Sequence, residues 1–379
     1  MARTRLRELI HRTGPFASVY FDGSHDAEDA DEQLELRYRT IREKLTAAGA
    51  SERTIGALGI ALFTGLPVPG RSGRALVADG DTVLLDHPLP TPPEHDTVRV
   101  SPLPYLLPLI EQRGPLVPHV LAVVNPVGAQ LRTVNRHGDA VNRVVSADVP
   151  SAGPPSGARP RPGIRRRDRD TLRHTVDAVV RELREQADHV RAEILALAGE
   201  PTVLAAVRTA LEAPAAPPDP DADSPGADAP AARPIRIVEL SGGATGSRAD
   251  RALLHEQVTK IVSETAGIQY RALLRHYRAE AELATGAAIG GLRETAAALR
   301  ENRVDYLLID PAALGDRTVL VGPAHTDVAT AAHELIGPTG PRRADEALPV
   351  AALAGGSEIV TVTGHITLPE GIGALLRPH

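Results

Sequence analysis

The sequence predicts a mixed α/β and α+β protein of three domains, each a mixed sheet with packed helices. Its 379 residues exceed what one hydrophobic core sustains, because domains of about 100–150 residues are the most common size. Segments with the alternating pattern of strands are interleaved with segments of helical periodicity, which is typical of layered sheets and helices. The predicted domains cover residues 1–112, 113–268 and 269–379.

The first predicted domain begins with a strand at 16–22, FASVYFD, where apolar and β-branched residues alternate. We expect Ser24 or Asp26 to cap the long helix that follows, because both side chains can accept a hydrogen bond from a helix N-terminus. A second helix around 52–63, a hairpin that turns at 79–81, and a short strand with a Pro-bounded segment near 98–110 complete this domain.

The second predicted domain starts with three short antiparallel strands from Val117. A segment rich in Pro, Gly and Arg follows and leads into a helix expected at 171–198. Residues 202–207, TVLAAV, favour a strand, and IRIVEL at 235–240 resumes the sheet. Between them, residues 213–233 form a Pro/Ala/Asp tract that is predicted to be disordered.

A helix expected from about 249 to 285, with a hinge near Gly267, leads into the third predicted domain. Its pattern of strands and helices indicates an α/β layer structure. The expected elements are a helix at 288–301, the strands VDYLLI and TVLV, a helix at 327–336, a loop over 342–354 and a last strand EIVTV.

Composition excludes several classes of function. The chain has no cysteine, so disulfides, thiolate nucleophiles and iron–sulfur clusters are absent, and no histidine motif indicates a metal site. We expect no cofactor. No apolar run approaches the ~20 residues of a membrane span, and the N-terminus lacks the pattern of a secretory signal, which predicts a cytoplasmic protein without a membrane partner. The formal net charge of −6 argues against a uniformly basic coat for DNA or RNA.

The most unusual local feature is a run of seven arginines within fifteen residues, on a loop that is expected to lead into a helix. Its members are Arg159, Arg161, Arg165, Arg166, Arg167, Arg169 and Arg173. Guanidinium groups bind phosphate and release condensed counterions, which favours RNA binding. The alternative is a solvated loop enriched by GC-rich codon usage typical of actinobacteria, since only Lys44 and Lys260 of the 42 basic residues are lysine.

Two further motifs offer weaker candidates. Ser24, His25 and Asp26 combine a hydroxyl, an imidazole and a carboxylate, but neighbours in sequence rarely converge on one substrate atom, so helix capping is the simpler interpretation. His25 stays a candidate contact at the tip of the domain. The glycine-rich turn at 242–248 lacks the lysine and spacing of a phosphate-binding loop, and we expect Ser247 or Asp250 to cap the next helix.

Three segments resemble a known family: GPFASVYFDGSHD at 14–26, RRADEALPVAALA at 342–354 and GIGALLR at 371–377. They are similar to actinobacterial members of the bacterial release-factor-like family 2, relatives of the ribosome hibernation factor Balon within the release factor and Pelota superfamily. The resemblance implies a Pelota-like architecture. It also implies a place in the ribosomal A site, with contacts to the RNA of both subunits, a role in hibernation or rescue under stress, and elongation factor Tu as an accompanying factor.

In true release factors of this superfamily, a Gly-Gly-Gln loop in the middle domain places the water that hydrolyses peptidyl-tRNA. The corresponding segment here, at 150–170, contains no glutamine, and Gly128-Ala129-Gln130 lies in a strand pattern. We therefore expect a protein that binds RNA without catalysis, with no catalytic residue. A peptidyl-tRNA hydrolase that uses a different loop residue is the alternative, and a protein-interaction scaffold without RNA is a third hypothesis.

Overall fold

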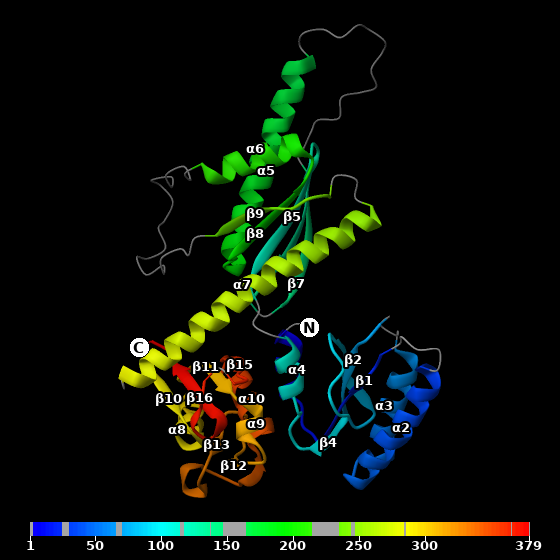
Figure 1. Ribbon diagram of the computed structural model, residues 1–379, viewed down its shortest axis with the longest axis vertical. Coiled ribbons are helices and arrows are strands. Elements are labelled where there is room, and N and C mark those ends of the chain that lie inside the picture. The colour runs from blue at the N-terminus through cyan, green and yellow to red at the C-terminus, as the bar shows by residue number, and fades with distance from the viewer. Residues whose placement is uncertain are drawn as a thin grey trace. The chain divides into compact units, whose positions relative to one another are not determined.

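Figure 1 shows the computed structural model, which describes residues 3–24, 30–65, 70–113, 117–136, 138–146, 164–213, 235–243, 247–283, 286–364 and 366–378. Within these ranges four sheets are interleaved with helices, which confirms the predicted mixed α/β and α+β class. The chain divides into two compact units, Arg3–Pro115 together with Gln269–His379, and Leu116–Ile268. The three-domain division at residues 112 and 268 stays a prediction.

The first unit contains an antiparallel sheet with the strand order β3-β2-β1-β4. Val19 and Phe21 of β1 pack against helices α2 and α3, and Phe16 and Tyr20 point to the opposite face, as the two-residue period of a strand requires. The elements are α1 (Arg3–Ile10), β1 (Phe16–Asp22), α2 (Ala30–Ala47), α3 (Glu52–Thr64), β2 (Gly73–Asp79), β3 (Thr82–Leu89), β4 (Thr97–Ser101) and α4 (Leu107–Arg113).

The C-terminal part of the same unit has a mixed sheet, β10-β16-β11-β15, and a small antiparallel sheet, β13-β12-β14. Leu6 and Leu109 from α1 and α4 share one apolar cluster with Leu299 and Leu348 of this part, so the two segments form a common core. The elements are β10 (Ala288–Gly290), α8 (Leu292–Arg300), β11 (Val304–Ile309), α9 (Pro311–Leu314), β12 (Thr318–Val321), β13 (Val328–Ala329), η1 (Ala332–Glu334), β14 (Gly340–Arg343), α10 (Ala344–Ala354), β15 (Glu358–Thr361), η2 (Pro369–Gly371) and β16 (Ile372–Leu376).

A buried charge network joins β4 to α10 inside this unit. The Arg99 guanidinium donates to both carboxylate oxygens of Asp345, each at 3.0 Å, and to Glu346 at 3.2 Å. Ser101 donates to Glu346 at 2.7 Å, and Arg343 also donates to Asp345 at 3.0 Å. The carboxylate side chains are only 8% and 4% exposed. Each buried charge therefore has a partner, which is the condition for tolerating it away from water.

The second unit is built on the sheet β7-β6-β5-β8-β9. β5, β8 and β9 run parallel, and β6 and β7 continue the sheet as antiparallel strands. Helices α5 and α6 cover one face, and the first part of α7 packs on the other. The elements are β5 (His119–Asn125), β6 (Gly128–Val134), β7 (Ala140–Ser146), α5 (Ile164–Val190), β8 (Ile194–Gly199), α6 (Pro201–Glu212), β9 (Arg236–Glu239) and α7 (Arg248–Leu283).

Two expectations for the middle of the chain are wrong. The helix predicted to reach residue 198 ends at Val190, because Arg191 adopts a left-handed conformation with φ 52° and the Ala192 amide closes the turn on Ala187. The apolar run that follows is the buried strand β8. Residues 202–207 belong to helix α6, whose start is marked by Pro201 and by the Glu200 carboxylate, which accepts hydrogen bonds from the next backbone amides.

Two further expectations fail near the C-terminus. The predicted helix at 327–336 is a two-residue strand and a short 3-10 turn, and the predicted loop at 342–354 is β14 and α10. Pro349 favours a loop by sequence, but it lies inside the buried helix α10. The hinge predicted near Gly267 lies inside the continuous helix α7, next to the boundary between the two compact units at residues 268 and 269, and it stays a prediction. The disordered tract predicted at 213–233 falls, from residue 214 onward, outside the described residues.

We predict that Arg99→Met lowers the free energy of unfolding by about 3 kcal/mol, because it leaves two buried carboxylates short of a cation. Urea unfolding followed by circular dichroism measures this. Arg303→Met is the matched control, because its ion pair with Glu301 is about half exposed and contributes roughly 0–1 kcal/mol. Equal losses for the two variants would show that the buried network does not stabilise the unit.

The same network predicts a pH dependence. Burial acts to raise the pKa of Asp345, but hydrogen bonds from Arg343 and Arg99 outweigh it and hold the pKa below its ordinary value of 3.8. Because the folded pKa is the lower one, the stabilisation is complete well above pH 3.8 and is lost as the pH falls through the folded value. The difference in stability between wild type and Arg99→Met should therefore shrink below about pH 4. A constant difference from pH 7 to pH 3 would contradict this.

Candidate nucleic-acid interface

The arginine run is carried by the longest helix on one face of the second unit's sheet. Val120, Ala122 and Val124 of β5 point to α5 and α6, and the alternate residues Leu121 and Val123 point to α7. From Val176 onward, α5 buries apolar side chains on this sheet, and the Thr175 hydroxyl donates to the Pro126 carbonyl at 3.3 Å. The sheet therefore fixes α5 from about Thr175 onward.

Helix α5 begins at Ile164, seven residues earlier than the sequence predicts. Arg165, Arg166, Arg167 and Arg169 consequently lie on its first two turns, and the expectation that they lie on a loop is wrong. Arg173 is exposed on the same helix. Arg159 and Arg161 lie outside the described residues. The helix places Arg165 about 15 Å beyond Thr175, the first fully buried residue, since each residue adds about 1.5 Å.

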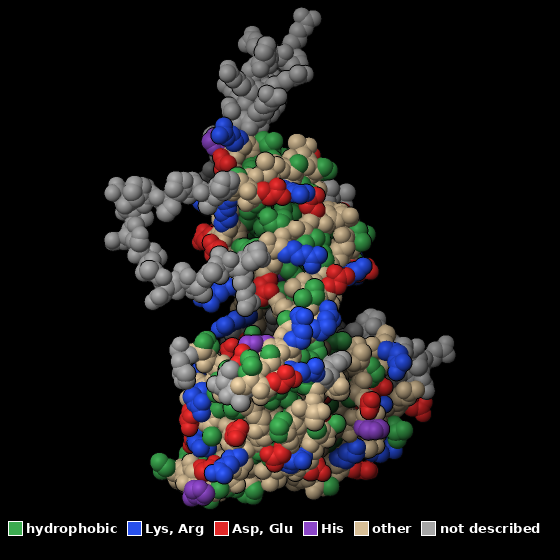
Figure 2. Space-filling model, turned by 60° about the vertical axis from the view of Figure 1, so that its left-hand side comes forward, with side chains coloured by type: hydrophobic (Ala, Val, Ile, Leu, Met, Phe, Trp, Pro, Cys, Tyr) green, Lys and Arg blue, Asp and Glu red, His purple; other side chains and the backbone are tan. Residues whose placement is uncertain are grey.

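Charge at this helix start opposes helix stability. A helix N-terminus carries partial positive charge, so arginines there are unfavourable and acidic residues would be favourable. The first turn of α5 has no acidic residue. Figure 2 shows basic and acidic side chains interspersed over the face of the molecule that it presents, which agrees with the net charge of −6. The concentration of arginine at 165–173 is therefore a local feature that folding does not explain.

The sheet adds polar side chains that the sequence analysis did not propose as contacts. On the face packed by α7, the described strands β6 and β7 expose Gln130, Arg132 and Asn142. The apolar cluster on that face contains residues of β5, β8 and β9 but none of β6 or β7. In the sequence of β6, the polar residues Gln130 and Arg132 alternate with the apolar residues Ala129 and Leu131. This period of two could have identified Gln130 and Arg132 as surface residues.

Neither Gly-x-Gln sequence lies at a loop tip. Gly128-Ala129-Gln130 opens strand β6, as expected, and Gly267-Ile268-Gln269 lies inside helix α7. In the glycine-rich turn, Ser247 accepts a hydrogen bond from the Asp250 amide at 3.1 Å, which confirms Ser247 as the cap of α7.

The second predicted contact, Ser24 with His25 and Asp26, is described only at Ser24. The hydroxyl of Ser24 donates to the Asp22 carboxylate at 2.5 Å and accepts from the Ser72 amide at 3.1 Å. The residues between Ser24 and the described start of α2 at Ala30 lie outside the described part of the chain, so the expectation that Ser24 or Asp26 caps this helix stays a prediction. Burial acts to raise the pKa of Asp22, but the hydrogen bonds from Ser24 and the nearby arginines lower it. His25 and Asp26 lie outside the described residues.

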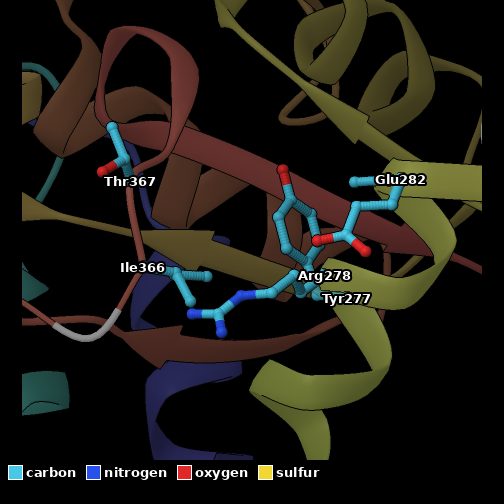
Figure 3. Close-up of a pocket in the computed structure, with 6 residues that line it drawn as sticks. Tyr277, Arg278, Glu282, Ile366 and Thr367 are labelled. Carbon is cyan, nitrogen blue, oxygen red and sulfur yellow. The ribbon is translucent and has the colours of Figure 1, made fainter.

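A hollow of about 250 Å³ lies in the first unit. Figure 3 shows residues that line it. Tyr277, Arg278 and Glu282 come from the end of α7, and Ile366 and Thr367 lie on the segment before β16. Tyr277 donates to the Ile289 carbonyl at 3.1 Å and thereby ties α7 to β10. A cation and a carboxylate four residues apart favour neither an anionic nor a cationic ligand.

Two kinds of site were not found in the described part of the chain. The residues that the structure describes contain no group of three or more His, Asp or Glu side chains that could hold a metal ion. None of the described helices is long and apolar enough to cross a membrane.

Comparison with known proteins gives consistent results. Residues 118–218 match the model of bacterial archaeo-eukaryotic release factor family 2. Two Mycobacterium tuberculosis proteins, Rv2629 of strain H37Rv and MT2704 of strain CDC 1551, are each 31% identical over 382 residues, which covers 100% of this chain and 97% of theirs.

Solved structures in the comparison are more distant. A model of ribosome-bound archaeal Pelota is 14% identical, covers 99% of this chain and 93% of its own, and has a TM-score of 0.37. The archaeal termination factor aRF1 is 13% identical, covers 100% and 98%, and has a TM-score of 0.23. The family model and the mycobacterial relatives therefore carry the assignment: the chain belongs to the bacterial archaeo-eukaryotic release factor family 2.

Proposed function

We propose that this release-factor-like protein binds the ribosomal A site as a hibernation or rescue factor and does not hydrolyse peptidyl-tRNA. The observation that carries the proposal is the arginine run on the first turns of α5, inside the segment that matches the family model. Release factors act on ribosomes, so membership of the family supports a ribosomal target. The arginines supply the chemistry for contact with ribosomal RNA.

Arginine suits this contact for two reasons. Its guanidinium stays charged at every physiological pH, and its planar donors match two phosphate oxygens at once. Five arginines and two aspartates lie between residues 165 and 173, so the segment keeps a local positive charge although the chain as a whole is acidic. When such a segment binds a dense array of phosphates, as in ribosomal RNA, the released counterions increase the affinity.

The proposed lack of hydrolysis rests on the absence of a glutamine from the segment that would carry it. Residues 150–170 contain none, Gln130 lies in strand β6, and Gln269 lies in helix α7. Helix and strand positions hold a side chain beside its own element, whereas placing a water in a remote catalytic centre requires a protruding loop. The arginine-bearing segment keeps the capacity to hold RNA without supplying this group.

The resemblance of the N-terminal segment extends the proposal to both subunits. Ser24, His25 and Asp26 would lie near the decoding end of the A site. Elongation factor Tu would accompany the protein on the ribosome. Both statements are part of the proposal and depend on the family likeness.

We predict that replacing Arg165, Arg166 and Arg167 with alanine weakens binding to 70S ribosomes. A plot of the logarithm of the binding constant against the logarithm of the salt concentration has a negative slope. The loss of three phosphate contacts should make this slope shallower by about 2 to 3 units. Co-sedimentation at several salt concentrations measures both the affinity and this slope.

A control with the same change of charge is available in the same unit. Arg181, Arg208 and Arg236 are exposed, and Arg181 lies about 24 Å along α5 from Arg165 at about 1.5 Å per residue. Replacing these three with alanine should leave most of the binding intact. If both triple variants bind like wild type, or if both lose binding equally, the proposed interface is wrong.

We further predict no release of peptide when the protein is mixed with ribosomes that carry peptidyl-tRNA. Single-turnover hydrolysis, with a Gly-Gly-Gln release factor as the positive control, measures this. Hydrolysis that copurifies with the protein and survives Gln130→Ala would favour the alternative, a peptidyl-tRNA hydrolase that uses another residue.

A further inference from the structure

A hollow of about 430 Å³ lies at one end of the first sheet, away from the arginine run in sequence and in unit. Its walls come from the start of β2, the end of β3 and helix α4. The volume is within the range of ~300–1,000 Å³ that is typical of small-molecule sites. The lining residues are Arg71, Ser72, His87, Pro88, Leu89, Pro90, Leu109 and Gln112.

The carboxamide of Gln112 has a defined orientation. Both the backbone amide and the hydroxyl of Thr91 donate to its oxygen, each at 3.3 Å. Since the backbone amide can only donate, the atom that faces it must be the oxygen. The NH₂ group of Gln112 is therefore turned away from Thr91, and the structure gives it no partner among the described residues. Gln112 lines the hollow, so we assign these two donors to a ligand bound there.

The other polar groups of the hollow also favour a ligand that carries hydrogen-bond acceptors. Ser72 lines the hollow and is 5% exposed, and its backbone bonds with Ser24. Arg71 is exposed at the rim and brings a permanent positive charge, which it shares with the nearby Asp22 carboxylate. None of the described residues that line the hollow is acidic. A ligand with a negative charge and with carbonyl acceptors matches this set.

The remaining wall is apolar. Pro88 and Pro90 are exposed and supply flat aliphatic surface, against which a planar ring can pack, and the buried Leu109 lies behind them in the wall. An anion, a set of carbonyl acceptors and a ring are combined in a nucleotide. We propose that this hollow binds a nucleoside monophosphate whose base carries carbonyl acceptors, with the phosphate at Arg71 and the base edge at Gln112.

The ligand is either a free nucleotide or a single residue of an RNA strand, since both present the same chemistry. The proposal does not depend on ribosome binding, because its residues and its test are separate from the arginine run.

The test is a calorimetric titration of the full-length protein with guanosine monophosphate, adenosine monophosphate and guanosine, without ribosomes. We expect guanosine monophosphate to bind more tightly than adenosine monophosphate, whose amino group replaces the carbonyl acceptor, and more tightly than guanosine. Arg71→Met should weaken the binding of guanosine monophosphate about tenfold or more, and should leave the binding of guanosine unchanged.

Gln112→Glu is the sharper variant. It keeps an acceptor for both Thr91 bonds, so the local structure is retained, but it replaces the NH₂ donors with a negative oxygen. We expect it to reduce binding by more than about tenfold. Arg53→Met is the control, because Arg53 is exposed on α3, which packs on the opposite face of the sheet.

A guanosine-containing single-stranded oligonucleotide separates the two sources. Binding of the oligonucleotide but not of the mononucleotide, lost in Gln112→Glu, would assign the site to an RNA residue. Saturation by the mononucleotide would assign it to a free ligand. The proposal is overturned if neither ligand binds, if guanosine and adenosine monophosphates bind equally, or if Arg53→Met weakens binding as much as Gln112→Glu.

Discussion

The contact between Arg99 and the two carboxylates of α10 sets the form of the first unit. Taking three charges out of water costs several kcal/mol each, so the arrangement is stable only where every charge has a partner. Asp345 and Glu346 lie in the first turn of α10, where the helix N-terminus also favours negative charge. Arg99 stacks over the Tyr105 ring at 3.5 Å, which adds a further contact to the cation. Because a shared apolar cluster surrounds this network, segments about 250 residues apart in the sequence behave as one core.

Helix α7 contributes side chains to the apolar clusters of both units. Its residues Leu254 and Ala266 lie in the core cluster of the second unit, and Leu274 and Tyr277 lie in a cluster of the first. Gly267 lies between these two stretches, at a position where glycine costs the helix roughly 1 kcal/mol relative to alanine. The helix is nevertheless continuous there, because packing on either side outweighs the local preference.

How much of the fold could be predicted depended on how strongly the local composition favours one kind of element. The strand FASVYFD has the predicted bounds although both of its faces are buried, because aromatic and β-branched side chains favour strands. The strand ILALAG and the helix ADEALPVAALA are buried on all sides, so neither shows a period that separates strand from helix. Composition alone revealed the arginine run. The hollow at Arg71, Ser72, His87 and Gln112 could not have been predicted, because its residues are individually ordinary and only the sheet brings them together.

The arginine run and the proposed nucleotide hollow would bind phosphate through different interactions. The arginine run gains affinity by releasing counterions, so it needs several phosphates at close spacing and loses strength steeply with salt. A free mononucleotide carries one phosphate and would gain little there. The hollow has a single arginine but holds donors and apolar surface in fixed positions, so its affinity depends on shape and on hydrogen bonds that salt screens weakly. Salt dependence therefore separates the two sites within one molecule, and a ligand that used both would be an RNA strand with one unstacked base.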